Sequence, residues 1–193
     1  MKPIFRIFSL TPETEAALLE QAANLLTVGF REHWPGSWAD HESAMEEVRE
    51  MVDPERICRA AVDEAGEVIG WIGGIPEYDG MVWELHPLVV RPDWQGRGIG
   101  RALVADFEDQ VRGKGGITIM LGSDDVDGMT TLSGVDLFPD PWVHIARIRN
   151  LKGHPFEFYQ KLGYTITGVV PDANGLGKPD ILMAKRVGRE TTS

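Results

Sequence analysis

Residues 90–101 read VRPDWQGRGIGR and place a glycine-rich loop between a strand-like run, Trp83–Val90, and a helix-like run, Gly100–Arg112. A Q-x-x-G-x-G spacing is formed by Gln95, Gly98 and Gly100. Such a loop exposes backbone N–H groups at a helix N-terminus, where the helix dipole favours a phosphate. Glycine suits this position because a side chain would keep the anion away from the amides. The stretch therefore predicts a site for a pyrophosphate-bearing cofactor.

Two other interpretations of the loop stay open at this point. One is dinucleotide binding, and Asp124 supports it because it stands about where a ribose-binding acid belongs. The glycine spacing fits less well, because Gly100 comes one position early for G-x-G-x-x-G. That fold usually opens with its glycine loop, whereas strand-like and helix-like segments precede it here. The other is an ordinary turn before a helix. Arg97 and Arg101 add positive charge beside the loop and favour an anion site.

Composition and charge limit the class of protein. A chain of 193 residues suits one domain with a sizeable core. Its 30 acidic and 19 basic residues give a formal charge of −11, which argues against nucleic acid or an anionic membrane and favours a cationic partner. Cys58 is the one cysteine, so no intrachain disulfide forms, and its neighbours RICRAAV predict a buried strand.

The first ten residues, MKPIFRIFSL, are too short and too interrupted for a signal peptide or a membrane span, so we expect a cytoplasmic protein. No metal site is expected, because His33, His41, His144 and His154 show no metal-ligand spacing with one another or with Cys58.

The remaining pattern predicts one α/β domain. Thr11 is expected to cap a first helix whose apolar stripe includes Leu25 and Leu26. The helix that follows the glycine loop is expected to have one apolar face, formed by Leu103, Val104, Phe107 and Val111. The other expected helices are Glu42–Met51, Gly100–Arg112 and Pro155–Gly163, and the expected strands are Ile4–Ser9, Arg56–Asp63, Glu67–Ile75, Trp83–Val90, Ile117–Gly122, Tyr164–Val170 and Ile181–Arg186. The β-branched run predicts that Ile117–Gly122 is a buried strand.

A long insertion, Ser123–His154, interrupts this pattern. Its first part, up to Asp140, contains no lysine or arginine but five aspartates: Asp124, Asp125, Asp127, Asp136 and Asp140. Loops of this length are functional or mobile, and a solvated acidic loop is the competing interpretation. Phe138 and Trp142 indicate that part of it packs against other residues.

The order of elements, together with the motifs QGRGIG (95–100) and FYQKLGY (158–164), resembles the GNAT superfamily of acyl-CoA-dependent N-acyltransferases over nearly the whole chain. This resemblance implies a single domain over residues 1–193 with an acidic insertion at about 123–154. It implies an α/β fold with a mixed, mostly antiparallel sheet, flanked by helices, with a splayed central strand pair. It also implies acetyl-CoA as co-substrate and a homodimer. The expected cofactor contacts are Leu88, Val89, Val90, Gln95, Gly96, Arg97, Gly98, Ile99, Gly100, Arg101 and Tyr159.

Five local phrases resemble aminoglycoside 6′-N-acetyltransferases of the chromosomal enterococcal type. They are DPERI (53–57), WELHPLVV (83–90), GGITIMLGSDD (115–125), HPFEFYQKLGY (154–164) and PDANGLGKPDI (171–181). The resemblance implies an aminoglycoside acceptor and a role in antibiotic resistance. The chain departs from many superfamily members, which carry Asn and Ala where Lys152 and Pro155 stand here.

Acetyl transfer to an amine needs a neutral nucleophile, a polarised carbonyl and a stabilised thiolate. Glu84 is near the position of the family's acceptor-side acid and is expected to take the proton; the alternative is a solvent-facing acid. Pro87 predicts a strand bulge that frees an amide, which we assign to Leu88, to polarise the thioester. Tyr159 is expected to protonate the departing sulfur, with a half-buried structural aromatic as the alternative. His86, on the same strand face, ranks below Glu84 as a base.

The acceptor is expected to be a polycation. Trp34 resembles an acceptor-lining tryptophan of the resistance enzymes by its position. A negative acceptor wall is expected from Asp124, Asp125, Asp127 and Asp136, beside Glu84 and His86. Three functions follow: an aminoglycoside 6′-N-acetyltransferase, a related enzyme for a polyamine or peptide amine, and a non-catalytic acyl-CoA or nucleotide-binding module.

Overall fold

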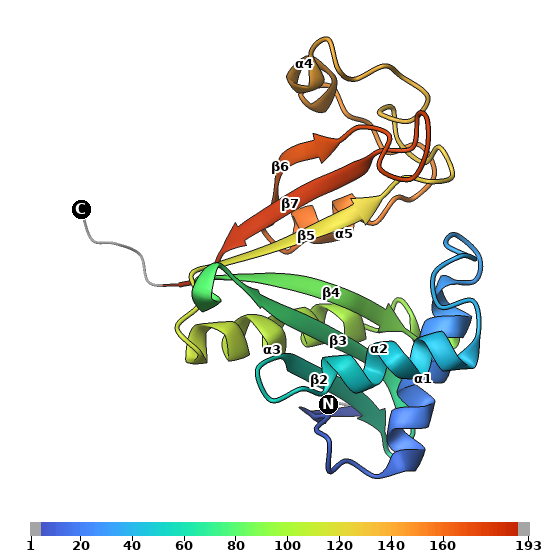
Figure 1. The fold of residues 1–193 in the computed structure, drawn as a ribbon, viewed down its shortest axis with the longest axis vertical. Helices are drawn as coiled ribbons and strands as arrows, with labels where there is room; N and C mark the ends of the chain where they lie inside the picture. The colour runs from blue at the N-terminus through green and yellow to red at the C-terminus, as the bar shows by residue number, and fades with distance from the viewer. Residues whose placement is uncertain (1–4, 189–193) are drawn as a thin grey trace. The chain divides into compact units, whose positions relative to one another are not determined.

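A computed structural model describes residues 5–188, which contain seven strands and five α-helices (Figure 1). The chain divides into two compact units, Met1–Ile119 with Val187–Ser193, and Met120–Arg186. Ile4, the expected start of the first strand, lies outside the described residues. The expectation of a single domain over residues 1–193 stays a prediction.

Four antiparallel strands form the sheet of the first unit. Their order is β1 (Phe5–Ser9), β2 (Ile57–Asp63), β3 (Val68–Glu77) and β4 (Val82–Val90). The hairpin between β2 and β3 turns at Gly66, whose φ of +85° favours glycine. Cys58 is buried in β2, as expected.

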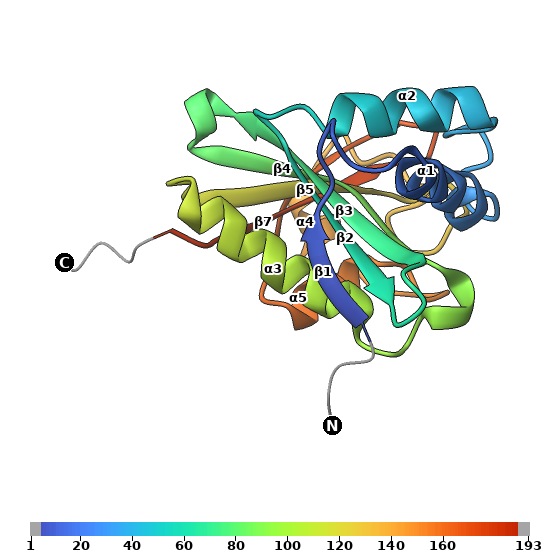
Figure 2. The same ribbon diagram turned by 90° about the horizontal axis from the view of Figure 1, so that it is seen from below.

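Both faces of this sheet are covered by helices. Helices α1 (Ala16–Phe30) and α2 (His41–Met51) lie on one face and α3 (Ile99–Gly113) on the other, as Figure 2 shows. Two adjacent glycines of β3 demonstrate this arrangement, because a Cβ at Gly73 would meet Met51 of α2, whereas a Cβ at Gly74 would meet the ring of Phe107 of α3. The predicted apolar face of α3 is confirmed, since the buried residues include Leu103, Val104, Phe107 and Val111.

The predicted start of the first helix is wrong. Thr11 does not cap α1, which begins at Ala16. Instead, the Thr11 amide donates to Thr14 Oγ1 at 2.9 Å and the Thr14 amide donates to the Thr11 carbonyl at 3.0 Å, so these residues close a separate turn. Helix α2 has a side-chain cap, because Asp40 Oδ1 accepts from the Ser43 amide at 2.9 Å.

The second unit carries a sheet with the order β5 (Thr118–Asp124), β7 (Asp180–Arg186) and β6 (Thr165–Val170). Strand β5 straddles the boundary between the units. Ile119 and Leu121 are buried, as predicted. The residues of β5 nevertheless alternate between buried and more exposed positions and Ile117 is 42% exposed, so the strand is buried on one face only. The sequence shows only that most residues of this run are apolar. Because side chains alternate between the two faces of a strand, only every second residue reaches the core.

The insertion is hydrogen-bonded rather than structureless. It contains the short helix α4 (Pro141–Ile145) and precedes α5 (Phe156–Lys161). A bridge pairs Thr130 with Asn150, and the Leu151 amide donates to the Met129 carbonyl at 2.8 Å. The two arms of the insertion therefore pair with each other.

The expected α/β class with a mostly antiparallel sheet is confirmed by the pairs within each unit. The splayed central strand pair stays a prediction. None of the helices within residues 5–188 is long and apolar enough to cross a membrane.

Candidate functional site

The glycine-rich loop has the backbone that its sequence predicts. Gly96 and Gly98 have φ of +72° and +85°, which other residues rarely adopt. Gly98 is the N-cap of α3, so the first amides of that 15-residue helix lack partners within the helix. A Cβ at Gly96 or Gly98 would meet no protein atom within 4 Å. The glycines therefore allow the positive φ of the loop and leave open space at the N-terminus of α3, and such a space suits an anion.

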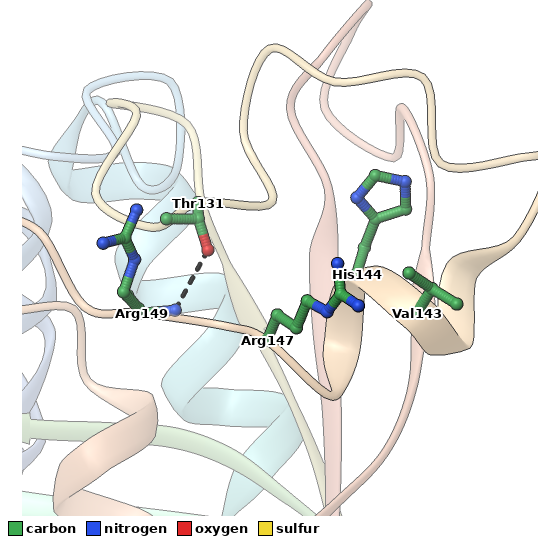
Figure 3. Close-up of a pocket in the computed structure, with 5 residues that line it drawn as sticks. All are labelled: Thr131, Val143, His144, Arg147 and Arg149. Atoms are coloured by element: carbon green, nitrogen blue, oxygen red, sulfur yellow. Dashed lines mark hydrogen bonds between the residues drawn. The ribbon is translucent and has the colours of Figure 1, made fainter.

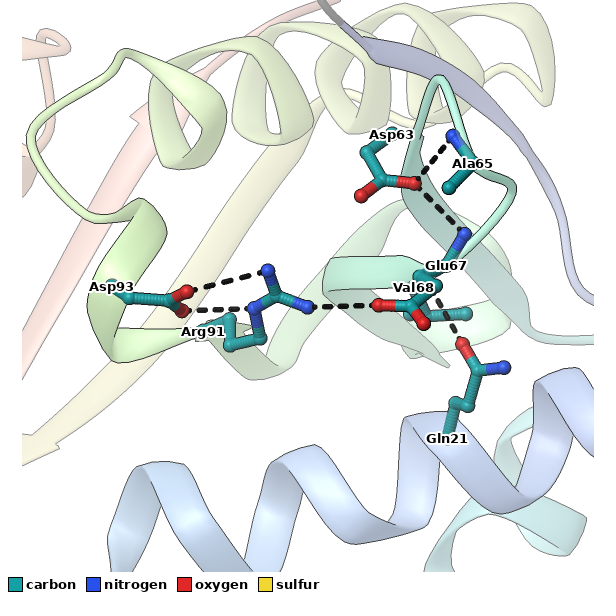
Figure 4. Close-up of polar contacts among 7 residues, drawn as sticks. All are labelled: Gln21, Asp63, Ala65, Glu67, Val68, Arg91 and Asp93. Carbon is teal, nitrogen blue, oxygen red and sulfur yellow. Dashed lines mark hydrogen bonds and ion pairs between the residues drawn. The ribbon is translucent and has the colours of Figure 1, made fainter.

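Side chains on both sides hold this loop in place. Gln95 Nε2 donates to the Val90 carbonyl at 3.2 Å, and the guanidinium of Arg97 lies 4.7 Å from the centroid of the Trp94 ring. Arg91 bridges Asp93 at 2.8 Å and Glu67 at 3.3 Å, which joins the end of β4 to the β2–β3 turn (Figure 4). The loop is anchored by these contacts. The exposed side chains of Arg97 and Arg101 add positive charge beside the amides at the start of α3.

Strand β4 contains the predicted bulge. Gly74 pairs with Leu85 and Ile72 pairs with Leu88, so one residue of β3 lies opposite two of β4, His86 and Pro87. Because side chains alternate along a strand, one extra residue exchanges the faces of everything that follows it.

This exchange separates two sets of side chains. Glu84 pairs with Ile75, which packs on the core beneath α1 and α2, so Glu84 shares that face. Val90 pairs with Gly70, where a Cβ would meet Leu103 of α3, so Val90 and Leu88 belong to the α3 face. The predicted acceptor acid thus lies on the opposite face of β4 from Leu88 and Val90, whereas Val89, another predicted cofactor contact, packs against Gly29 of α1.

Glu84 is half-buried and, among residues 5–188, forms no side-chain hydrogen bond or ion pair. A carboxylate in this state retains its full capacity to accept hydrogen bonds from a cation.

Aromatic side chains gather on the same face of the first unit. Phe30 forms edge-on contacts with Trp34 and Trp38, with centroids 5.7 and 4.8 Å apart. Trp38 Nε1 donates to Glu47 Oε2 at 3.3 Å, and Glu47 Oε1 lies 3.8 Å from His86 Nε2. His86 therefore shares the α1–α2 face with Glu84, as the strand period predicts.

Sequence reasoning missed Glu47 and gave no role to Trp38. Glu47 is one of several acids on α2, and nothing in its spacing distinguishes it from Glu46 or Glu50. Only the packing of α2 on β4 brings its carboxylate to His86.

Tyr159 belongs to the second unit, on α5, together with the predicted acidic wall. It is 9% exposed, and its ring contacts Phe158 and Tyr164 edge-on. Burial raises the pKa of the Tyr159 phenol above its ordinary value. The phenol therefore stays protonated at neutral pH and retains a proton to donate.

The aspartates of the insertion have different environments. Asp125 is fully buried, and its carboxylate accepts from the amides of Met129 at 2.6 Å and Thr130 at 2.8 Å. This geometry gives Asp125 the role of organising the loop, which replaces the expected acceptor contact. Asp124 accepts from Asn174 Nδ2 at 2.5 Å and stays partly exposed, whereas Asp127 and Asp136 are exposed.

His154 completes this organisation. Its Nε2 lies 3.1 Å from the Asp124 carbonyl and its Nδ1 accepts from the Phe156 amide at 3.2 Å, which fits the neutral Nε2–H tautomer. Burial lowers the pKa of His154, outweighing the hydrogen bond to the Asp124 carbonyl, which raises it. A neutral, fully bonded imidazole is a structural residue.

Other reactive groups do not form a site. Burial raises the pKa of the Cys58 thiol to about 12, so it carries no thiolate at neutral pH. Within residues 5–188, no group of three or more His, Cys, Asp or Glu side chains could hold a metal ion.

Comparison with known proteins identifies relatives of this arrangement. Residues 19–127, more than half of the chain, match the acetyltransferase (GNAT) family. A mycothiol acetyltransferase from Stackebrandtia nassauensis is 34% identical over 92 residues, which cover 47% of this chain and 30% of that protein. The match thus spans under a third of that relative's length.

Three solved structures are similar over almost all of the chain. An aminoglycoside 6′-N-acetyltransferase complexed with coenzyme A is 46% identical with a TM-score of 0.87, covering 96% of this chain and 98% of that one. The aminoglycoside 6′-N-acetyltransferase from Enterococcus faecium is 45% identical with a TM-score of 0.86 and the same coverages. An aminoglycoside 6′-acetyltransferase type Ii is 41% identical with a TM-score of 0.74, covering 96% and 99%.

Proposed function

Because this chain belongs to the acetyltransferase (GNAT) family, we propose that it transfers the acetyl group of acetyl-CoA to the 6′-amine of an aminoglycoside and so confers resistance. The observation that carries the choice of acceptor is the identity of 41–46% over 96% of the chain to three aminoglycoside 6′-acetyltransferases. The negative charge of −11 agrees with a cationic acceptor.

The glycine-rich loop is proposed to hold the pyrophosphate of acetyl-CoA. The free amides at the start of α3, the open space at Gly96 and Gly98 and the charges of Arg97 and Arg101 fit an anion. Leu88–Val90, which follow the bulge in β4, are proposed to pair with the pantetheine arm through their backbone. Beyond the bulge, the Leu88 amide is proposed to polarise the thioester carbonyl.

The acceptor amine is proposed to bind on the α1–α2 face of β4. Glu84 offers a carboxylate without a protein partner, and Trp34 and Trp38 offer aromatic faces to a sugar ring or ammonium. Glu84 removes a proton from the ammonium, directly or through a water molecule. The neutral nitrogen then attacks the thioester carbon, so a C–N bond forms, the C–S bond breaks and the thiolate leaves. Tyr159 donates its proton to the sulfur, and the second proton that the acylated nitrogen loses restores the phenol through solvent.

The test follows free thiol released from acetyl-CoA. Release is expected with kanamycin, which bears a 6′-amine, and no 6′-N-acetyl product is expected from a similar drug with a 6′-hydroxyl. Thiol release that polyamines or peptides stimulate while kanamycin does not would assign the enzyme to another amine. If no acceptor of any class stimulated thiol release, the chain would be a non-catalytic binding module.

Matched variants test the roles of single residues. Glu84→Gln and Tyr159→Phe are each expected to slow turnover by up to about 10²–10⁴-fold, while acetyl-CoA affinity in calorimetry stays near that of the wild type. Their controls are Glu46→Gln and Tyr78→Phe, which alter exposed side chains of the first unit. Wild-type rates in both test variants would make Glu84 and Tyr159 structural residues.

The cofactor assignment has its own variant. Gly98→Asp places an anion at the α3 N-terminus and is expected to abolish acetyl-CoA binding, whereas Gly113→Asp, at the other end of α3, is expected to preserve it. Equal affinity in the two variants, or tight binding of NADH by the wild type, would refute the assignment. A homodimer and a cytoplasmic location are part of the proposal and are tested by light scattering and cell fractionation.

A further inference from the structure

The second unit contains an open cavity of about 440 Å³ that the proposed acetyl transfer does not use. It is lined by Thr131, Val143, His144, Arg147 and Arg149. Figure 3 shows Thr131 and Arg149 on one side and Val143, His144 and Arg147 on the other. A cavity of this volume falls within the size range of small-molecule sites, about 300–1,000 Å³.

Backbone hydrogen bonds order the two segments that carry these side chains. Turns continue past α4, because the Arg147 amide donates to the His144 carbonyl at 3.1 Å, so residues three apart lie on one side. On the other wall, the Thr131 amide donates to the Arg149 carbonyl at 3.1 Å and the Arg149 amide donates to Thr131 Oγ1 at 3.0 Å. The cationic groups therefore project from an ordered frame.

Charge makes the cavity unusual in a chain that is acidic overall. Arg147 and Arg149 are exposed and, within residues 5–188, form no ion pair. Nearby acids of the insertion already have other hydrogen-bond donors: Asp125 accepts from Met129 and Thr130, Asp136 from Phe138, and Asp140 from Val143. Two guanidinium groups and an imidazole thus line one cavity without a protein anion to neutralise them.

We propose that this cavity binds the phosphate monoester of a small organic molecule. A guanidinium binds phosphate through paired N–H···O bonds, and two of them match the charge of a dianionic phosphate better than that of a single carboxylate. His144 and Thr131 line the same cavity and supply further polar groups, while Val143 offers apolar surface to the organic part. The size of the cavity leaves room for that part beside the phosphate.

The test is titration calorimetry of the full chain at low ionic strength with inorganic phosphate, glucose 6-phosphate and acetate as probes. Both phosphates are expected to bind more tightly than acetate, and glucose 6-phosphate more tightly than inorganic phosphate. Equal binding of the two phosphates would reject the organic part of the ligand. Equal binding of acetate and phosphate, or no phosphate binding, would overturn the proposal.

Variants locate the binding. Arg147→Gln and Arg149→Gln are each expected to weaken phosphate binding about tenfold, since each removes a charge-assisted contact. The control pair Arg56→Gln and Arg112→Gln removes the same charge from exposed ion pairs elsewhere and is expected to leave binding unchanged. Circular dichroism verifies folding. Phosphate held at the α3 loop would be insensitive to Arg147 and Arg149, and unchanged affinity in those variants would overturn the proposal.

Discussion

Replacing Asp125 by alanine removes the acceptor of two buried amides. The carboxylate is 0% exposed, and the amides of Met129 and Thr130 donate to it at 2.6 and 2.8 Å. A hydrogen bond to a charged group contributes roughly 1.5–3 kcal/mol, so losing both costs about 3–6 kcal/mol. Because a whole domain is stable by only about 5–15 kcal/mol, this substitution is expected to unfold much of the second unit.

Two further variants calibrate that magnitude. Asp125→Asn keeps one carbonyl oxygen for one amide and is expected to lose about half as much stability. Asp136→Ala removes an exposed carboxylate that accepts one amide at 3.1 Å and is expected to cost less than about 1 kcal/mol.

Urea denaturation followed by circular dichroism gives the change in unfolding free energy, and hydrogen exchange reports the Met129 and Thr130 amides directly. An Asp125→Ala protein within about 1 kcal/mol of the wild type, with both amides equally protected, would refute the structural role. If that protein also showed a raised Michaelis constant for kanamycin, the acceptor role expected from sequence would be restored.

Two other predictions concern stability. The pKa of His154 is lowered in the folded state, so as the pH falls the unfolded chain takes up this proton before the folded chain does. The stability that the neutral His154 contributes is therefore expected to be complete above about pH 6.5 and to decrease below it. Denaturation at several pH values is expected to show that His154→Gln loses this dependence. An unchanged slope in the variant would remove His154 as its source. Gly74→Ala places a Cβ against the Phe107 ring and is expected to lower the unfolding free energy by about 1–3 kcal/mol. Gly113→Ala is the control, because its Cβ would meet nothing within 4 Å. Equal thermal midpoints of the two variants would contradict the packing of α3 on the sheet.

The sequence predicted the features that depend on a single residue type or on the regular spacing of apolar residues. Pro87 cannot donate to a strand ladder, so a bulge in β4 followed from its position. The stripe from Leu103 to Val111 predicted the buried face of α3 because helical periodicity determines it. The glycines of the loop predicted open space beside the amides, and a Cβ at Gly96 or Gly98 would meet no protein atom within 4 Å.

Other features depended on contacts that local pattern does not encode. Thr11 carries the residue type of a helix cap, but Thr11 and Thr14 close a separate turn, and α1 begins only at Ala16. Asp125 looks like its neighbours in sequence, and only the folding of the insertion buries it. The pairing of Glu47 with Trp38 and His86 likewise requires α2 to be packed on the sheet.

The extra residue in β4 has a consequence for how such an enzyme changes over time. Glu84 and His86, which precede it, belong to the α1–α2 face, and Leu88 and Val90, which follow it, belong to the α3 face. In the proposed function, mutations that select a new amine fall on the surface of Glu84 and His86, separate from Leu88 and Val90, which are proposed to bind the acyl donor. The range of acceptors could then change while donor binding stays constant, and deleting the one extra residue would couple the two again.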